Sequence, residues 1–240
     1  MRAGPAWAVL LLALVGTAAR AEATAEARIR AALARWLPGV QVEAVRPSPV
    51  KGLYEVVFNA SVLYATADGR YVFSGALFDT RAGRDLAERS RAAQRLKMLD
   101  AVPADKMIIY AADRPRHQLT VFTDVDCPYC RRFHQEVPDL VRQGITVRYL
   151  LFPRGGLATP TYAKSVAVWC APDRKRALDA AKRGEKLPTR ACDNPVGEHY
   201  RLGERMGVSG TPTLITERGE KITGYVPLGQ LVKMLDAHGS

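Results

Sequence analysis

The sequence predicts a protein of mixed α+β and α/β class, divided into a small N-terminal domain, a connecting helix and a larger C-terminal domain. Three observations predict this organisation. A helix and several short strands come first, a highly charged run of helix-forming residues follows, and strands then alternate with helices up to the C-terminus. The composition, with 48% hydrophobic and 25% charged residues, is typical of a folded globular protein.

The first 21 residues have the pattern of a secretory signal peptide. Arg2 provides a short basic start, residues 7–15 are apolar, and Ala19-Arg20-Ala21 has the form of a cleavage site, so the mature chain is expected to begin at Glu22. A membrane anchor is the alternative, but this apolar run is too short to cross a bilayer. Export would bring the chain to a compartment where disulfides persist, which in a Gram-negative bacterium is the periplasm.

The distribution of charge argues against a nucleic-acid partner. The formal net charge is +11, and loss of Arg2 and Arg20 with the signal peptide leaves about +9. The basic residues are scattered, and the tightest run covers only residues 174–176. Since there is no long basic arm and no alternation of aromatic and basic residues, nucleic-acid binding is disfavoured.

Residues 22–82 are predicted to form the N-terminal domain. Its helix is expected at 24–37, and its strands at 40–45, 53–59, 62–66 and 71–78. Asp68-Gly69 is a hairpin turn before the last of these strands. A unit this small buries little core alone, so we expect a second copy or another domain to cover it. Residues 83–104 form the linker, with a helix at 84–99; an ordinary packed helix of one domain is the alternative.

Residues 105–240 are predicted to form the C-terminal domain. Strands are expected at 119–123, 145–152, 213–216 and 221–226, and helices at 130–142, 162–170, 174–182, 198–206 and 228–237. A Cys-x-x-Cys sequence lies between the first of these strands and the helix after it. This order, with its helical insertion before the final hairpin, is expected of a thioredoxin-like domain.

The motif Cys127-Pro128-Tyr129-Cys130 predicts thiol–disulfide exchange. Its position places the first sulfur at a helix N-terminus, where unpaired backbone N–H groups and the positive end of the helix dipole favour a thiolate. We therefore expect Cys127 to be an ionised, solvent-reachable nucleophile and Cys130 to be the resolving thiol. Pro128 and Tyr129 shape the start of the helix and are candidate client contacts.

The residues around the motif leave several alternatives open. Arg131 and Arg132 either assist the thiolate or belong to a solvated helix face, which is favoured, and His134 is expected at the surface rather than as a proton shuttle. Thioredoxin carries an acid six residues before its first active cysteine, and Val121 stands at that place here. Whether Asp124 or Asp126 reaches Cys130 instead is left open.

Thr211-Pro212 is the second local signal. This proline precedes an apolar strand about 80 residues after the motif, and in thioredoxin-like proteins the bond before such a proline is cis and faces the two sulfurs. We favour a cis bond here, which would leave the backbone of Thr211 free to pair with an extended substrate strand. The alternative is a trans proline that opens an edge strand.

The chain resembles the periplasmic disulfide isomerase family DsbC, of which DsbG is a close relative. The resemblance is carried by an ordered set of motifs at residues 62–64, 68–69, 120–124, 144–150, 152–154, 169–170 and 207–212. It implies a V-shaped homodimer joined through the N-terminal domains, with Gly75 at a dimer contact. It also implies misoxidised or unfolded exported proteins as clients, a membrane reductase of the DsbD type as electron donor, and no cofactor.

The other two cysteines help to separate the relatives. In an exported protein Cys170 and Cys192 are expected to form a disulfide, which contributes about 3 kcal/mol on a chain-entropy estimate. DsbC-like proteins typically have this second disulfide, whereas Pro128-Tyr129 is closer to DsbG. A four-cysteine zinc site is disfavoured because there is no second Cys-x-x-Cys pair, and no metal is expected.

The favoured function is that of a periplasmic disulfide isomerase and reductase with holdase-like binding of its clients. Two alternatives remain. One is a DsbG-like reductase or chaperone that protects single thiols, and the other is a DsbA-like oxidase, which the N-terminal domain disfavours.

Overall fold

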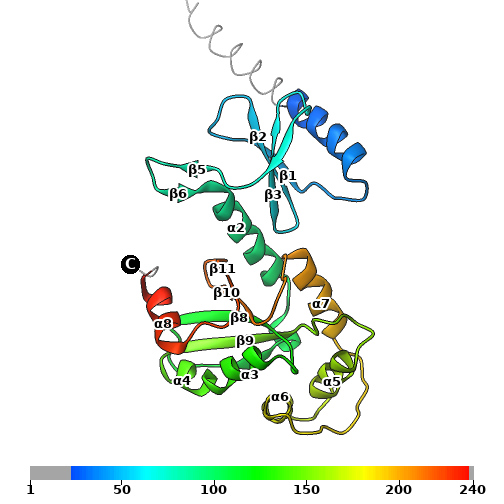
Figure 1. The fold of residues 1–240 in the computed structure, drawn as a ribbon, viewed down its shortest axis with the longest axis vertical. Coiled ribbons are helices and arrows are strands. Elements are labelled where there is room, and N and C mark those ends of the chain that lie inside the picture. The colour runs from blue at the N-terminus through cyan, green and yellow to red at the C-terminus, as the bar shows by residue number, and fades with distance from the viewer. Residues whose placement is uncertain (1–22, 238–240) are drawn as a thin grey trace, which may run out of the picture. The chain divides into compact units, whose positions relative to one another are not determined.

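The computed structural model describes residues 23–237 and forms two compact units, with the division between Arg91 and Ala92 (Figure 1). The division falls within helix α2 (Leu86–Asp100), inside the segment that the sequence assigns to the linker. The predicted signal peptide lies outside the described residues. Within residues 23–237, no helix combines the length and the apolar character that crossing a bilayer requires.

The first unit is an antiparallel sheet covered by a helix at residues 23–36. Its strands are β1 (Ala44–Pro47), β2 (Leu53–Phe58), β3 (Ser61–Thr66) and β4 (Val72–Ser74), in the order β1-β2-β3-β4. Ile29 and Leu33 of the helix pack on Val56 and Ala65 of the sheet. The alternation of side chains along β2 turns Val57 to the opposite face, where it packs with Ala87 of α2.

The expected strand at 71–78 is wrong in its second half. β4 ends at Ser74, and the chain then forms a separate ribbon of β5 (Phe78–Asp79) and β6 (Arg84–Asp85). The Asp79 carboxylate accepts hydrogen bonds from the backbone N–H groups of Arg81 and Ala82, which closes this turn. Phe78 is 62% exposed. The apolar residue that suggested a longer strand is therefore not part of the core of the described chain.

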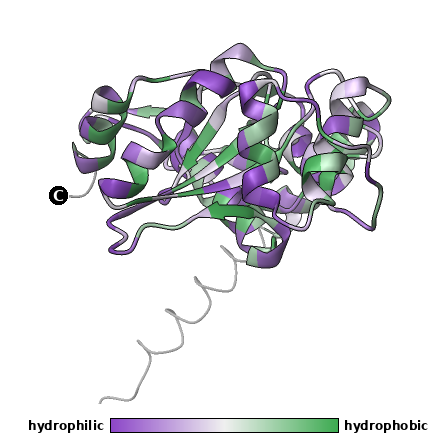
Figure 2. Ribbon diagram, turned by 90° about the horizontal axis from the view of Figure 1, so that it is seen from below, coloured by the Kyte–Doolittle hydropathy of each residue, from purple (hydrophilic) through white to green (hydrophobic). Residues whose placement is uncertain are grey.

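The second unit contains a five-stranded sheet in the order β11-β10-β8-β9-β7 (Figure 1). The strands are β7 (Ile108–Tyr110), β8 (His117–Thr123), β9 (Ile145–Leu151), β10 (Thr213–Thr216) and β11 (Lys221–Thr223). β8 and β9 run parallel and the other neighbours are antiparallel. Figure 2 shows hydrophobic residues along the central strands and hydrophilic residues over much of the loops and outer helix turns.

The helices of the second unit confirm the thioredoxin-like arrangement with an insertion. After the short helix η1 (Ala104–Lys106) they are α3 (Pro128–Gln135), α4 (Val137–Arg142), α5 (Pro160–Trp169), α6 (Arg174–Arg183), α7 (Val196–Arg205) and α8 (Leu228–Ala237). The insertion comprises α5, α6 and α7. A disulfide between Cys170 and Cys192, with Cα atoms 5.7 Å apart, ties the end of α5 to the segment before α7.

The single helix expected at 130–142 is divided into α3 and α4 at Glu136. Pro138 has no N–H to donate to His134, and its ring is incompatible with a continuous helix at that point. The Glu136 carboxylate accepts hydrogen bonds from the Tyr225 hydroxyl and, at 2.9 Å, from the backbone N–H of Leu228. The break therefore presents an acceptor to the segment that leads into α8.

The turn between β10 and β11 lies against the last part of α2. The buried Arg95 donates from Nε to the carbonyl oxygen of Gly219 at 2.6 Å. Gly219 has φ +81°, and a Cβ built there would clash with the carbonyl oxygen of Ala92. Only glycine satisfies both the backbone conformation and this close approach.

We expect Gly219→Ala to destabilise the second unit by about 3 kcal/mol, because it adds a clash with fixed backbone to an unfavourable φ. Gly224→Ala is the matched control: its φ is +92°, but a Cβ there meets no atom within 4 Å. The control should lose about 1 kcal/mol, from the backbone term alone. Urea unfolding measures both, and equal losses would contradict the importance of the α2 contact.

Candidate active site

Cys127 lies where β8 gives way to α3, as the N-cap residue of that helix. Its φ and ψ of −74° and 123° are extended, and Pro128 occupies the first helical position. The backbone N–H of Arg131 donates to the Cys127 carbonyl at 3.0 Å, which closes the first turn. Proline suits this position because its fixed φ is helical and its missing N–H would have had no partner.

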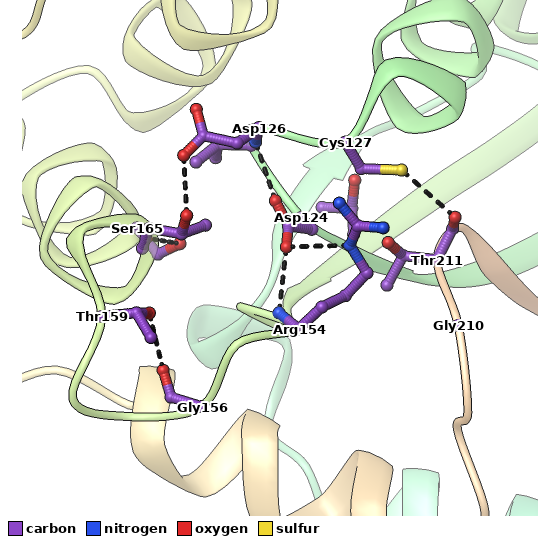
Figure 3. Close-up of polar contacts among 12 residues, drawn as sticks. Asp124, Asp126, Cys127, Arg154, Gly156, Thr159, Ser165, Gly210 and Thr211 are labelled. Carbon is purple, nitrogen blue, oxygen red and sulfur yellow. Dashed lines mark hydrogen bonds and ion pairs between the residues drawn. The ribbon is translucent and has the colours of Figure 1, made fainter.

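The loop before β10 meets this sulfur. Thr211-Pro212 is a cis peptide bond, and Cys127 Sγ donates to the Thr211 carbonyl oxygen at 3.3 Å (Figure 3). The Thr211 hydroxyl is buried and has no hydrogen-bond partner among the described residues. Because β8 pairs with β10, with Phe122 opposite Thr213, the end of one strand and the start of the other lie at the same edge of the sheet.

Both thiols of the motif are free and fully buried, each with 0% of its surface exposed. The expectation of a solvent-reachable Cys127 is therefore wrong for this conformation. Tyr129, between the two cysteines, is by contrast 62% exposed. A client can reach Cys127 Sγ only when the groups that cover it move apart.

The two thiols differ in acidity. Burial by itself would raise the pKa of Cys127, but the neighbouring polar groups of Thr211 and Cys130, together with the charge of Arg154, hold this pKa below its ordinary value. Burial raises the pKa of Cys130, and the charge of Lys182 and the neighbouring polar groups of Thr211, Asp124 and Thr123 only partly offset it. The thiol at the helix start is thus the better thiolate.

Asp124 does not serve as a proton acceptor for Cys130, because its buried carboxylate is engaged elsewhere. One oxygen accepts from the backbone N–H of Asp126 at 2.8 Å, and the other accepts from the backbone N and from Nε of Arg154 at 2.9 and 3.2 Å (Figure 3). The pair fixes the loop after β9 and holds the Arg154 guanidinium where its charge favours the Cys127 thiolate.

Asp126 is likewise committed to other partners. Its carboxylate accepts from Lys164 Nζ at 2.8 and 2.9 Å and from the Thr161 hydroxyl at 2.7 Å, and Arg131 lies 3.5 Å away. These contacts join the loop before α3 to helix α5. Neither carboxylate near the motif therefore takes the role of the missing thioredoxin acid.

His134 is buried, so the expectation of a surface histidine is wrong. Its ring nitrogens lie 3.0 Å from the Tyr149 hydroxyl and 2.9 Å from the Asp179 carboxylate. The network joins α3 to β9 and α6 below the motif. Arg132 does lie on an exposed helix face, stacked 4.7 Å from the centre of the Tyr225 ring, whereas Arg131 is half-buried and donates to the Val125 carbonyl.

Lys182 is a residue of the site that the motif analysis missed. It lies on α6, is 4% exposed, and donates from Nζ to the Thr123 hydroxyl at 2.6 Å and to the Asp124 carbonyl at 2.9 Å. A signal was present in the sequence: helical spacing places Lys182 one turn after Leu178, on the apolar face of the helix. Reading that face for charged residues would have found it.

The remaining predicted residues belong to other elements than the motif. The Cys170–Cys192 disulfide belongs to the helical insertion, and Gly75 follows β4 in the first unit. In the part of the chain that the structure describes, no group of three or more His, Cys, Asp or Glu side chains is arranged to hold a metal ion.

A sheet of this order, with two neighbouring thiols at the start of a helix and a cis-proline loop opposite them, defines the thioredoxin-like class of proteins. Two family models agree and extend this to the first unit. The model described as a thioredoxin-like domain matches residues 104–239, and the one described as the disulfide bond isomerase protein N-terminal domain matches residues 18–88.

The chain belongs to the DsbC family of thiol:disulfide interchange proteins. It is 36% identical over 213 residues to DsbC of Escherichia coli K12, covering 89% of this chain and 88% of that protein. It is 37% identical over 232 residues to DsbC of Dickeya dadantii, covering 97% and 94%. A solved disulfide interchange protein from Neisseria gonorrhoeae is 34% identical with a TM-score of 0.51, covering 58% of this chain and 99% of that one.

We expect Arg154→Met to raise the pKa of Cys127, because it removes a favourable charge and leaves the Asp124 carboxylate less neutralised. At pH 7 the rate of alkylation of Cys127 should fall by about three- to tenfold in consequence. The measurement is iodoacetamide reactivity against pH in a Cys130→Ala background. Arg142→Met, which removes an exposed arginine paired with Asp139, is the control and should leave the profile unchanged; an unchanged profile for Arg154→Met would contradict this role.

Proposed function

We propose that this chain is a disulfide isomerase and reductase of exported proteins, with Cys127 as nucleophile and Cys130 as resolving thiol. The observation that carries the proposal is the asymmetry of the two thiols. Cys127 caps a helix, faces Thr211 and has a lowered pKa, whereas Cys130 is buried one turn further with a raised pKa. Membership of the DsbC family supports the same assignment.

Isomerisation leaves the protein in its starting redox state. The Cys127 thiolate attacks a client disulfide, a bond forms between Cys127 and one client sulfur, and the other client sulfur leaves as a thiolate. A client thiolate then attacks the mixed disulfide, forms a new client disulfide and releases Cys127 as a thiolate. No electrons are gained or lost overall.

Reduction uses the second thiol. Cys130 attacks the sulfur of Cys127, the bond to the client breaks, and the client leaves with both of its cysteines reduced while the protein gains the Cys127–Cys130 disulfide. Two electrons pass from the protein to the client. A membrane reductase of the DsbD type is the proposed donor that restores the dithiol.

Client binding is assigned to the residues around the covered sulfur. Tyr129 offers an exposed aromatic ring beside Pro128, and the Thr211 hydroxyl is a free hydrogen-bonding group next to Cys127. An extended client segment that pairs with the backbone of Thr211 and packs on Pro212 would place its sulfur opposite Cys127.

The N-terminal domain is proposed to join two copies into a homodimer. β4 is an edge strand of the first unit, and Tyr71 and Phe73 on or beside it are 59% and 46% exposed. Pairing with a second copy would cover this edge. The proposed location is the periplasm, reached through the signal peptide.

Two experiments test this function, of which the first separates isomerase from oxidase. Cys127→Ser should reduce the refolding of scrambled ribonuclease to the uncatalysed rate, since no other free thiol of the described residues caps a helix. Cys130→Ser, the matched control, should retain part of the isomerase activity and accumulate mixed disulfides with clients. Full activity of Cys127→Ser would refute the proposal. Oxidation of reduced ribonuclease without reshuffling would favour the DsbA-like alternative.

The second experiment concerns assembly. Gly75→Arg should give monomers by sedimentation and lose most isomerase activity, because a long charged side chain blocks close approach of a second backbone. Within the protomer a Cβ at Gly75 meets no atom within 4 Å, but its φ of +158° is unfavourable for a side chain, so urea unfolding must show that the variant is folded. Val50→Arg, at an exposed position of the same unit, is the control and should remain dimeric. An intact Gly75→Arg dimer would count against the proposed contact.

A further inference from the structure

Lys182 is a buried cation that the mechanism above does not use. It lies near the end of α6 among the buried residues Ala177, Leu178 and Ala181, and only 4% of its surface is exposed. Removing an ammonium group from water is costly unless an opposite charge or strong acceptors compensate it. The position therefore requires a reason beyond packing, which a hydrophobic residue would serve better.

The immediate partners of Lys182 do not neutralise its charge. Nζ donates to the hydroxyl oxygen of Thr123 at 2.6 Å and to the backbone carbonyl of Asp124 at 2.9 Å, and both acceptors are neutral. The Asp124 carboxylate, which is nearby, already accepts from Arg154 and from the backbone of Asp126. The charge of Lys182 is thus available to another anion.

The sulfur of Cys130 is the group placed to use it. Thr123 accepts the hydrogen bond from Lys182 with a lone pair, so its own hydroxyl proton remains available to the Cys130 thiol, and Thr123 and the Lys182 charge both act to lower the pKa of that thiol. Both the ammonium charge and the hydroxyl donor favour the thiolate form of this fully buried thiol. Lys182 on α6 and Thr123 at the end of β8 therefore act together on Cys130 of α3.

We propose that Lys182 is a positioning residue for the resolving step, and that it stabilises the developing Cys130 thiolate partly through Thr123. This rests on the proposed function, in which Cys130 resolves the mixed disulfide. In that step Cys130 loses its proton and bonds to Cys127, the Cys127–client bond breaks, and the client sulfur leaves with the electron pair. The proton passes, through solvent, to the departing client thiolate, so that the step is balanced.

The charge of Lys182 depends on its surroundings. The titratable or charged groups around Lys182 come from four elements or segments. They are Tyr110 on β7, Asp124 and Cys127 after β8, Cys130, Arg131 and His134 on α3, and Asp179 and Arg183 on α6. Burial lowers the pKa of Lys182 to about 8, although the charges of Cys130 and Asp124 act in the opposite direction. The ammonium is therefore present below that pH and lost above it, and its help to Cys130 should follow.

The test separates the two thiols in one reaction. Reduced protein is mixed with an aromatic disulfide such as Ellman's reagent; attack by Cys127 releases one chromophore, and attack by Cys130 on the resulting mixed disulfide releases the second. The variant Lys182→Met keeps an unbranched side chain that is one atom shorter and removes its charge. We expect it to slow the second phase by about tenfold at pH 7 and to change the first phase by less than about twofold.

The pH profile distinguishes a charge effect from a structural one. The ratio of wild-type to Lys182→Met rates in the second phase should shrink as the pH rises past about 8, where wild-type Lys182 loses its proton. Lys182→Arg, which keeps the charge, should restore most of the rate below that pH. Lys175→Met, on an exposed position of the same helix, should match the wild type throughout.

Three outcomes would overturn the inference. The first is an unchanged second-phase rate in Lys182→Met, and the second is slowing of both phases by the same factor at every pH. The third is a Thr123→Val effect that adds fully to that of Lys182→Met, since action through a shared hydroxyl requires the double variant to be less slow than the sum of the two single effects. Loss of the first phase in wild-type protein would instead refute the proposed function. Urea unfolding of each variant shows that a folded protein was compared.

Discussion

The structure of the second unit depends on one meeting point, where the end of β8 and the start of β10 bring Cys127 and Thr211 together. The antiparallel pairing of Phe122 with Thr213 fixes the register, so the chain leaving β8 and the chain entering β10 must lie side by side. The contact of 3.3 Å from Cys127 Sγ to the Thr211 carbonyl follows from that register. A one-residue slip between these strands would turn every side chain to the other face and separate the two loops.

Around this point, a different basic side chain acts on each of the two sulfurs. Arg154 is held by the Asp124 carboxylate on the side of Cys127, and Lys182 is held by neutral acceptors on the side of Cys130. The carboxylates of Asp124 and Asp126 both accept hydrogen bonds that join loops and helices. The result is that positive charge rather than a buried acid dominates the environment of the thiols.

The fold class and the order of elements in the second unit could be predicted from the sequence, because long apolar strands and the Cys-x-x-Cys position are local signals. The break at Glu136 could also have been found, since Pro138 marks it in the sequence. The end of β4 is different: its apolar continuation is exposed in the protomer, and only tertiary packing decides whether such residues pair. The local sequence pattern therefore cannot predict where β4 ends.

For the site, residue types were easier to predict than surroundings. The helix-capping position of Cys127 follows from adjacent residues, whereas the burial of His134 and the covering of Cys127 depend on α6, β9 and the Thr211 loop, which are distant in sequence. Lys182 is 55 residues after Cys127 in the sequence, and only the packing of α6 against α3 shows that it belongs to the site.

The complete cover over Cys127 also bears on how long such a thiol survives. A thiolate open to solvent is readily converted by peroxides to sulfenic acid and then irreversibly to sulfinic and sulfonic acids. With none of its surface exposed, Cys127 is shielded from small oxidants in this conformation. The burial that limits access of clients to the sulfur would thus also slow its irreversible oxidation and extend its working life.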